Sequence, residues 1–179
     1  MDILKIVVTG AYASGKTRFI QSISEIEVVS TEAEVQHTEE LEIKNQTTVA
    51  LDFGRITINP EVALYLFGTP GQERFDFMWE ILSVGCIGYL VMVDSTRPAQ
   101  LREAANVIRF FTSMIDVPFV VVANKQDDPT CLPVEYIRYR LGLPDYIPVL
   151  PCVAKERESV KNVLLTLLEM IYQVNEESA

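Results

Sequence analysis

The sequence predicts an α/β fold with a six-stranded, mostly parallel sheet that has one antiparallel strand and helices on both faces. Short β-branched runs alternate with longer amphipathic runs along the 179 residues, which is typical of βαβ units. Two alternating segments meet at Asn59 and Pro60, a turn sequence that predicts one antiparallel hairpin. The length suits a single domain over residues 1–179, which can bury a core without disulfides or a metal.

The first half of the chain begins with a predicted buried strand and contains the predicted hairpin. Residues 3–9 read Ile, Leu, Lys, Ile, Val, Val, Thr, which favours a strand covered on both faces. A loop then leads into a helix over residues 16–24. The segment 25–46 is rich in glutamate with weak periodicity, so it receives no assignment to a helix or strand. Residues 48–58 and 62–67 alternate apolar and polar side chains and are the two hairpin strands.

The second half alternates predicted helices and strands. Pro98 suits the first turn of a helix, and the last helix carries apolar residues at i, i+3 and i+4, an arrangement that faces a core. The predicted strands are residues 86–94, 117–123 and 147–152, and the predicted helices are residues 72–84, 98–114, 132–141 and 159–174.

Composition excludes several classes of function. Fifteen Lys and Arg against 25 Asp and Glu give a net charge of −10, which argues against a nucleic-acid or anionic-membrane partner. Three widely spaced cysteines indicate reduced thiols in a cytoplasmic protein. A single histidine, His37, argues against a zinc site or a triad with a histidine base. Asp2 and a final segment without cysteine predict that no lipid anchor is attached.

A phosphate-binding loop is predicted between the first strand and the first helix. Residues 10–17 read Gly-Ala-Tyr-Ala-Ser-Gly-Lys-Thr and fit G-x-x-x-x-G-K-[ST] in the context that this motif requires. The glycines let backbone N–H groups point at a β-phosphate, and the helix adds its positive end. Lys16 is expected to bridge the β- and γ-phosphates, and the Thr17 hydroxyl to bind Mg²⁺.

A base-reading motif follows the strand at residues 117–123. Asn124, Lys125 and Asp127 form N-K-x-D. The Asp127 carboxylate can accept hydrogen bonds from guanine N1–H and the 2-amino group, whereas adenine would leave it unpaired. Asn124 is expected to tie this loop to the phosphate loop, and the stem of Lys125 to cover the base. Residues 153–155 resemble the third base-contacting segment of guanine-nucleotide sites, in which a backbone N–H donates to guanine O6.

With these motifs and Leu66-Phe-Gly-Thr-Pro-Gly-Gln-Glu-Arg-Phe75, the chain resembles the Ras superfamily of small GTPases along essentially its whole length. The form LFGTPGQERFDFMW is similar to a prokaryotic branch, the gliding-motility GTPases that work with roadblock-type partners. The resemblance implies a P-loop NTPase G domain that binds GTP or GDP and Mg²⁺. It also implies that Gly71 contacts the γ-phosphate, that Gln72 orients the attacking water, and that Thr48 binds the metal in the GTP state. Thr47 competes with Thr48 for that role.

The sequence departs from the family pattern at Gly68, where an aspartate usually holds Mg²⁺ through its second coordination shell. Pro70 also removes a backbone N–H before Gly71. The gliding-motility branch shares both features. Arg74 is a candidate internal arginine finger. The simpler interpretation, which we favour, is a solvated surface arginine. Arg18 and Arg55 carry no stronger argument.

These interpretations predict a slow, partner-activated GTPase switch with Gln72 and Lys16 as catalytic residues and Thr17 and Thr48 as metal ligands. The predicted nucleotide-binding residues are Gly10, Ala13, Ser14, Gly15, Lys16, Thr17, Arg18, Thr48, Gly71, Asn124, Lys125, Asp127, Ala154 and Lys155. One rival is a nucleotide-loaded binding module that barely hydrolyses, which Gly68 supports. The other is an ATP-using phosphotransferase, which Asp127 disfavours. A transport or assembly ATPase would need a longer chain.

Overall fold

The computed structural model describes residues 2–30, 51–70 and 77–177. Their strands form one sheet in the order β2-β3-β4-β1-β5-β6-β7. The strands are β1 Asp2–Gly10, β2 Val29–Ser30, β3 Asp52–Asn59, β4 Val62–Gly68, β5 Cys86–Asp94, β6 Phe119–Asn124 and β7 Val149–Pro151. The helices are α1 Lys16–Ile23, α2 Phe77–Ser83, α3 Leu101–Met114, α4 Val134–Leu141 and α5 Arg157–Glu177, with a 3-10 turn η2 at Pro98–Gln100.

The pairing of the strands confirms the predicted fold class. β1 pairs in parallel with β4 and β5, and β5-β6-β7 continue in parallel. β3 is antiparallel to β4, which is the predicted hairpin, and among the described strands it alone runs against the others. The sheet has one strand more than predicted, because the two-residue β2 joins the edge at β3. So short a strand leaves no periodicity that a sequence pattern could detect.

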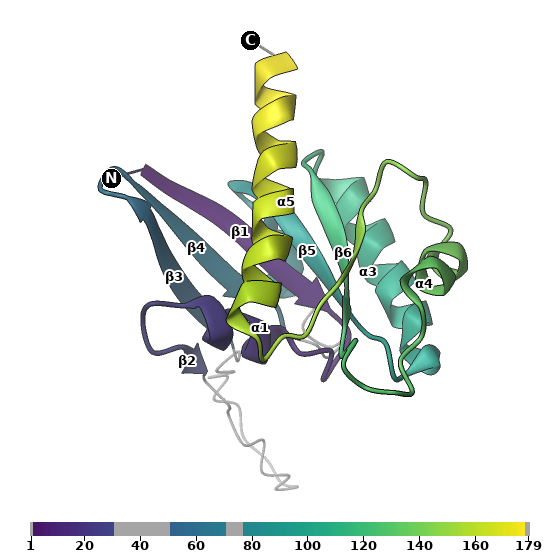
Figure 1. The fold of residues 1–179 in the computed structure, drawn as a ribbon. Coiled ribbons are helices and arrows are strands. Elements are labelled where there is room, and N and C mark those ends of the chain that lie inside the picture. The colour runs from purple at the N-terminus through teal and green to yellow at the C-terminus, as the bar shows by residue number, and fades with distance from the viewer. Residues whose placement is uncertain (1, 31–50, 71–76, 178–179) are drawn as a thin grey trace, which may run out of the picture.

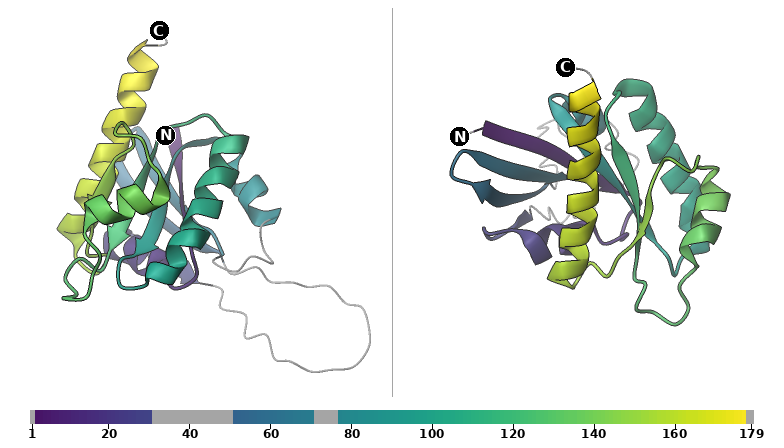
Figure 2. Two further views of the ribbon diagram at one scale, coloured as in Figure 1. Left: turned by 90° about the vertical axis from the view of Figure 1, so that its right-hand side faces the viewer. Right: turned by 45° about the horizontal axis from the view of Figure 1, so that its top comes forward.

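Helices cover both faces of the sheet, as predicted. On one face, α1 and α5 pack side chains such as Phe19 and Leu167 on β1 and β5. On the other, α2, α3 and α4 contribute Trp79, Phe111 and Ile137 to a second cluster. Figure 1 shows α5 crossing the sheet, and the turned view in Figure 2 places it and α3 on opposite sides. Burying these large side chains on both faces stabilises the three-layer arrangement.

Several predicted boundaries shift. The helix predicted over 132–141 begins at Val134, because Pro133 is extended (φ −60°, ψ 145°) and caps it. The strand predicted over 147–152 is only three residues long, and η2 precedes α3 within the helix predicted over 98–114. The last helix is longer than predicted, at Arg157–Glu177. The predicted strand 48–58 and the predicted helix 72–84 both begin outside the described residues, at residues 48–50 and 72–76.

This topology brings the motif-bearing loops to one edge. The loops after β1, β6 and β7 all leave the carboxyl ends of parallel strands, which meet at the same end of a sheet. In Figure 1 this end lies toward the bottom, near the start of α1.

Candidate nucleotide-binding site

The backbone of the loop between β1 and α1 is shaped by its glycines. Gly10 has φ +141°, and a Cβ there would lie 2.3 Å from the carbonyl oxygen of Met92 on β5. Gly15 has φ +103°, and its Cβ would lie 2.2 Å from Nδ2 of Asn124. Only glycine accommodates both the dihedral angle and the close approach. Ala13 also has a positive φ, of 59°, so the loop curls on itself as a phosphate-binding loop does.

Lys16 is the first residue of α1 and is buried, with 7% of its surface exposed. Its Nζ donates hydrogen bonds to the carbonyl oxygens of Gly10 and Ala11 at 3.0 and 2.7 Å. Burial lowers the pKa of Lys16 from 10.5 to about 8, while the charges of Asp52 and Glu103 act in the opposite direction. The ammonium group therefore sits inside the loop, where a phosphate would replace carbonyls as its partner.

Two neighbouring hydroxyl groups differ in their surroundings. Ser14 is fully buried, and its Oγ has no hydrogen-bond partner among the described residues, so the site holds an unused polar atom next to the loop amides. Thr17 is exposed, and its hydroxyl donates to Oδ2 of Asp52 on β3. Arg18, the next residue of α1, is exposed.

The residues present fit a magnesium ion. At nucleotide sites Mg²⁺ takes one or two hard protein oxygens, and phosphates and water supply the rest. Thr17 offers such an oxygen beside Lys16. Over residues 2–30, 51–70 and 77–177, no group of three or more His, Cys, Asp or Glu could form an all-protein metal cage.

Asn124 joins the predicted phosphate and base loops. Its side chain is buried at the end of β6. Nδ2 donates to the carbonyl oxygen of Ser14 at 3.0 Å, and Oδ1 accepts from the N–H of Ala154 at 2.9 Å. One amide thus holds the phosphate loop, the loop after β6 and the loop after β7 together, including the link that the sequence predicted.

Lys125 follows with φ +65° and directs its Nζ to Oδ2 of Asp94, 2.6 Å away. Asp94 is fully buried at the end of β5. Burial works to raise the pKa of Asp94, but hydrogen bonds from Lys125 and Thr96 hold it below its ordinary value. Sequence reasoning missed Asp94. The one signal for it was an aspartate ending a predicted central strand, at the edge where ligands bind.

Asp127 lies at the surface of the site. Its carboxylate is 38% exposed and forms an ion pair with Lys155. The Lys155 hydrogen bond lowers the pKa of Asp127, and the same contact raises the pKa of Lys155. The structure therefore brings two of the predicted base-binding residues together. Lys155 contacts Oδ2 of this carboxylate, and a guanine would compete with Lys155 for that oxygen or bind at the carboxylate beside it.

Five residues whose roles came from the resemblance to small GTPases lie outside the described residues. They are Thr47, Thr48, Gly71, Gln72 and Arg74. Arg55, the remaining arginine considered, is half-buried on β3.

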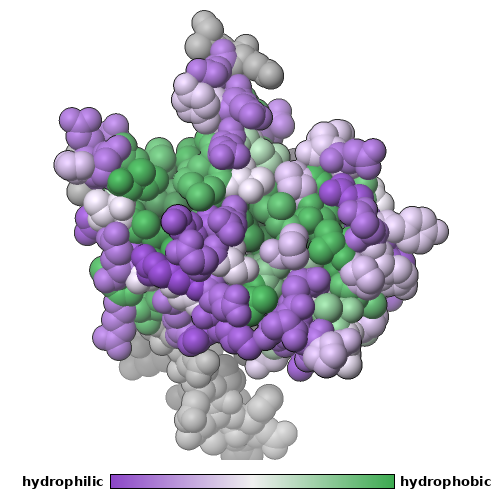
Figure 3. Space-filling model, in the orientation of Figure 1, coloured by the Kyte–Doolittle hydropathy of each residue, from purple (hydrophilic) through white to green (hydrophobic). Residues whose placement is uncertain are grey.

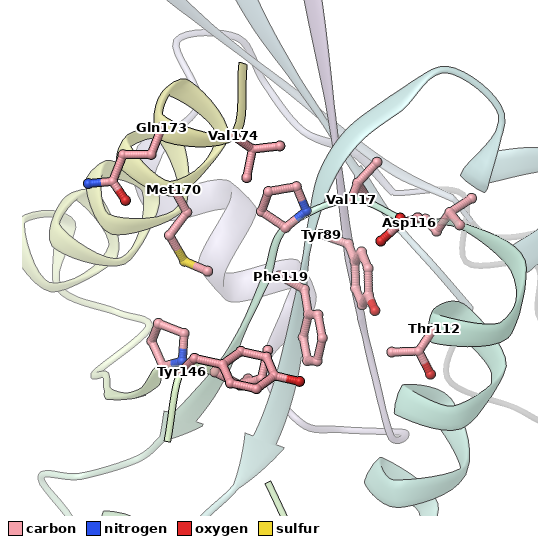
Figure 4. Close-up of a pocket in the computed structure, with 13 residues that line it drawn as sticks. Tyr89, Thr112, Asp116, Val117, Phe119, Tyr146, Met170, Gln173 and Val174 are labelled. Carbon is pink, nitrogen blue, oxygen red and sulfur yellow. The ribbon is translucent and has the colours of Figure 1, made fainter. Parts of the chain in front are cut away.

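A separate pocket lies away from this edge, beside the start of β6 and the ends of α3 and α5. It has a volume of about 560 Å³ and is lined by residues that include Tyr89, Phe119, Tyr146 and Met170. Tyr89 and Phe119 stack with ring centroids 4.8 Å apart. Figure 4 shows the aromatic rings and Met170 around the hollow. None of the predicted site residues lines it.

The face of the molecule drawn in Figure 3 is polar near the edge that carries the predicted nucleotide-binding loops. In the space-filling view, hydrophilic residues gather over the lower part of the α5 face, around α1 and the start of α5 (Figure 3). No described helix has the length and apolarity needed to cross a bilayer.

Comparison with known proteins gives both a family and individual relatives. The sequence model of a family described as "Conserved hypothetical ATP binding protein" matches residues 8–174. An uncharacterized protein of Methanocaldococcus jannaschii is 31% identical over 126 residues, 70% of this chain and 72% of that protein. The human ADP-ribosylation factor-like protein 4C is 29% identical over 177 residues, covering 94% of this chain and 86% of the relative. The human ADP-ribosylation factor-related protein 1 is 32% identical over 98 residues, 53% of this chain and about half (48%) of the relative.

Proposed function

The chain belongs to the family of conserved hypothetical ATP-binding proteins, and from that premise we propose that it is a guanine-nucleotide switch that hydrolyses GTP to GDP and phosphate. Nucleotide binding and a small-GTPase-like character follow from this family and from the similarity to ADP-ribosylation factor-like proteins. The choice of guanine, the hydrolysis and the switching are our proposal.

The observation that carries the proposal is the double hydrogen bond of Asn124. It fixes the phosphate loop at Ser14 and the loop after β7 at Ala154, while Asp127 lies three residues further along the chain. A purine nucleotide with its phosphates over Lys16 would place its base near Asp127. The Asp127 carboxylate then discriminates in favour of guanine, because adenine would not supply two donors.

For hydrolysis we assign roles by residue. Lys16 and the loop amides hold the phosphates and stabilise the charge of the transition state. Mg²⁺, when bound, would neutralise negative charge that develops on the phosphates. Thr17 would hold the ion, with Thr48 as its partner in the GTP state. Gln72 would orient the water, and Gly71 would contact the γ-phosphate. These last three roles rest on the resemblance to small GTPases.

We also propose, from the resemblance alone, that a roadblock-type protein regulates this switch. Without an arginine finger among the assigned residues, turnover is expected to be slow, below roughly 10⁻² s⁻¹. Arg74 could supply a finger in place of a partner, and a fast intrinsic rate would favour that assignment.

The family description favours a second candidate function, ATP binding. Single-turnover phosphate release from GTP and from ATP, with Mg²⁺, separates the two. We expect slow release from GTP alone. Faster release from ATP would contradict the proposal. The variant Gln72→Leu should reduce the GTP rate by about 10² or more if Gln72 positions water. Equal rates for this variant and the unaltered protein would remove the proposed role of Gln72, and the absence of phosphate release from GTP by the unaltered protein would assign the chain to the nucleotide-loaded binding modules.

A further inference from the structure

The space beside Gly68 is filled by an aspartate of the neighbouring strand. Gly68 ends β4 and pairs directly with Asp52 at the start of the antiparallel β3. A Cβ at Gly68 would lie 2.9 Å from Cβ and 3.3 Å from Oδ2 of Asp52. The carboxylate of Asp52 therefore occupies the volume that a side chain at position 68 would need. Aspartate side chains at positions 68 and 52 would therefore compete for the same volume.

This carboxylate faces the residues expected at the metal. Oδ2 of Asp52 accepts the hydrogen bond of the Thr17 hydroxyl, and the charge of Asp52 also acts on Lys16. A hydroxyl that donates its proton to a carboxylate directs its lone pairs away from that carboxylate, where a cation can meet them. Asp52 is half-buried and Thr17 is exposed, so an ion and its waters can reach both.

We propose that Asp52 supplies the carboxylate that holds Mg²⁺ at this site, from β3 and in place of the missing aspartate at position 68. It acts as a positioning residue: it orients the Thr17 hydroxyl and accepts hydrogen bonds from water on the metal. The inference rests on the proposed nucleotide site, and it explains why Gly68 does not leave that site without a carboxylate. Magnesium bound beside phosphates keeps several waters, whose protons need acceptors of this kind.

A purely structural role for the Asp52–Thr17 hydrogen bond predicts something different. The bond also joins β3 to the first turn of α1, where a carboxylate stabilises the helix. Loss of that role would weaken the fold with or without metal. Loss of a metal-positioning role would appear only when Mg²⁺ is present, so magnesium dependence distinguishes the two.

The test uses the variant Asp52→Asn and a fluorescent GDP analogue. The rate at which the analogue dissociates from the variant and from the unaltered protein is measured first in EDTA and then at increasing Mg²⁺ concentrations. We expect the rate in EDTA to match the unaltered protein, and the Mg²⁺ concentration that gives half of the slowing to rise about 10–100-fold. The matched control is Glu61→Gln, which removes one negative charge at the exposed turn of the same hairpin and should leave that concentration unchanged. The inference would be overturned if the Mg²⁺ concentration that gives half of the slowing in Asp52→Asn lay within about threefold of that in the unaltered protein.

A second variant moves the carboxylate across the strand pair. In Asp52→Gly with Gly68→Asp, the closest obstacle to the new Cβ is removed, and the next, Cδ1 of Ile20 at 3.0 Å, is the end of a flexible side chain. We expect magnesium dependence to return to within about tenfold of the unaltered protein. If this variant binds the analogue in EDTA but does not respond to Mg²⁺, the inference is wrong.

Failure of the proposed function gives a different result. In that case the unaltered protein would not retain the GDP analogue in EDTA or in Mg²⁺, and no variant would be needed to see it. Retention by the unaltered protein with equal magnesium dependence in Asp52→Asn would overturn only the role of Asp52.

Discussion

The phosphate loop and the base-reading loop lie at the same edge of the sheet but are held in different ways. In the phosphate loop, Lys16 and Ser14 are buried and the backbone approaches its neighbours too closely for any Cβ at Gly15. In the base-reading loop, Asp127 is exposed and paired with Lys155 at the surface. The residues that we propose for phosphate binding are thus part of the folded core, whereas the proposed choice of base would depend on an ion pair that solvent and ligand can exchange.

The largest effect should follow from Gly15→Ala, because the new Cβ would meet Nδ2 of Asn124 at 2.2 Å with φ at +103°. We expect a loss of about 3 kcal/mol or more of unfolding free energy and loss of GDP binding. Gly142→Ala is the matched control: its φ is +62°, but nothing lies within 4 Å of the new Cβ, so about 1–2 kcal/mol is expected. Urea unfolding of both variants measures the difference, and equal losses would refute the claim that packing constrains Gly15.

Asn124→Ala should rank next, because it leaves Ser14 O and Ala154 N without their partner. Two buried polar groups without partners cost about 2–4 kcal/mol. The matched control, Asn106→Ala at an exposed position on α3, should change the unfolding free energy by no more than about 0.5 kcal/mol. Denaturant unfolding compares the two. A small effect at Asn124 would mean that the two loops do not depend on each other.

Lys16 makes the phosphate loop sensitive to pH in the absence of nucleotide. Burial lowers its pKa from 10.5 to about 8, so between these values the unfolded chain binds more protons than the folded one. The contribution of Lys16 therefore makes stability rise with pH across this window, by on the order of 3 kcal/mol in total. The unfolding free energies of the unaltered protein and of Lys16→Met are measured from pH 8 to 10.5. The value for the unaltered protein should rise by this amount relative to the value for the variant. Parallel pH profiles would show that Lys16 is not buried as described.

The smallest effect belongs to the surface pair. Lys155→Met should leave the unfolding temperature unchanged, because exposed ion pairs contribute little to stability. It should raise the pKa of Asp127, since the Lys155 hydrogen bond is the first cause of its lowering. Carboxyl-carbon NMR titration measures this pKa. A clear drop in unfolding temperature would make the base-reading loop structural and remove the contrast with the phosphate loop.

How far the sequence predicts the site depends on how local each feature is. The glycine-dependent loop between β1 and α1 and the link from Asn124 to Ser14 could be predicted because their motifs fall within a few consecutive residues. The hydrogen bond between Thr17 and Asp52 could not, since the position of Asp52 depends on the pairing of β3 with β4, and strand register is a long-range property. Asp94 was missed for the same reason: its role depends on β5 lying beside β6. The two-residue β2 and the three-residue β7 likewise depend on neighbouring strands.

The central claim is that the core-held loop grips phosphates while Asp127 selects the purine. Calorimetric titration of the purified protein with GDP and with ADP, both with Mg²⁺, tests it most directly. We predict that GDP binds more tightly than ADP by about 10⁴-fold or more. ADP binding equal to or tighter than GDP binding would contradict the account.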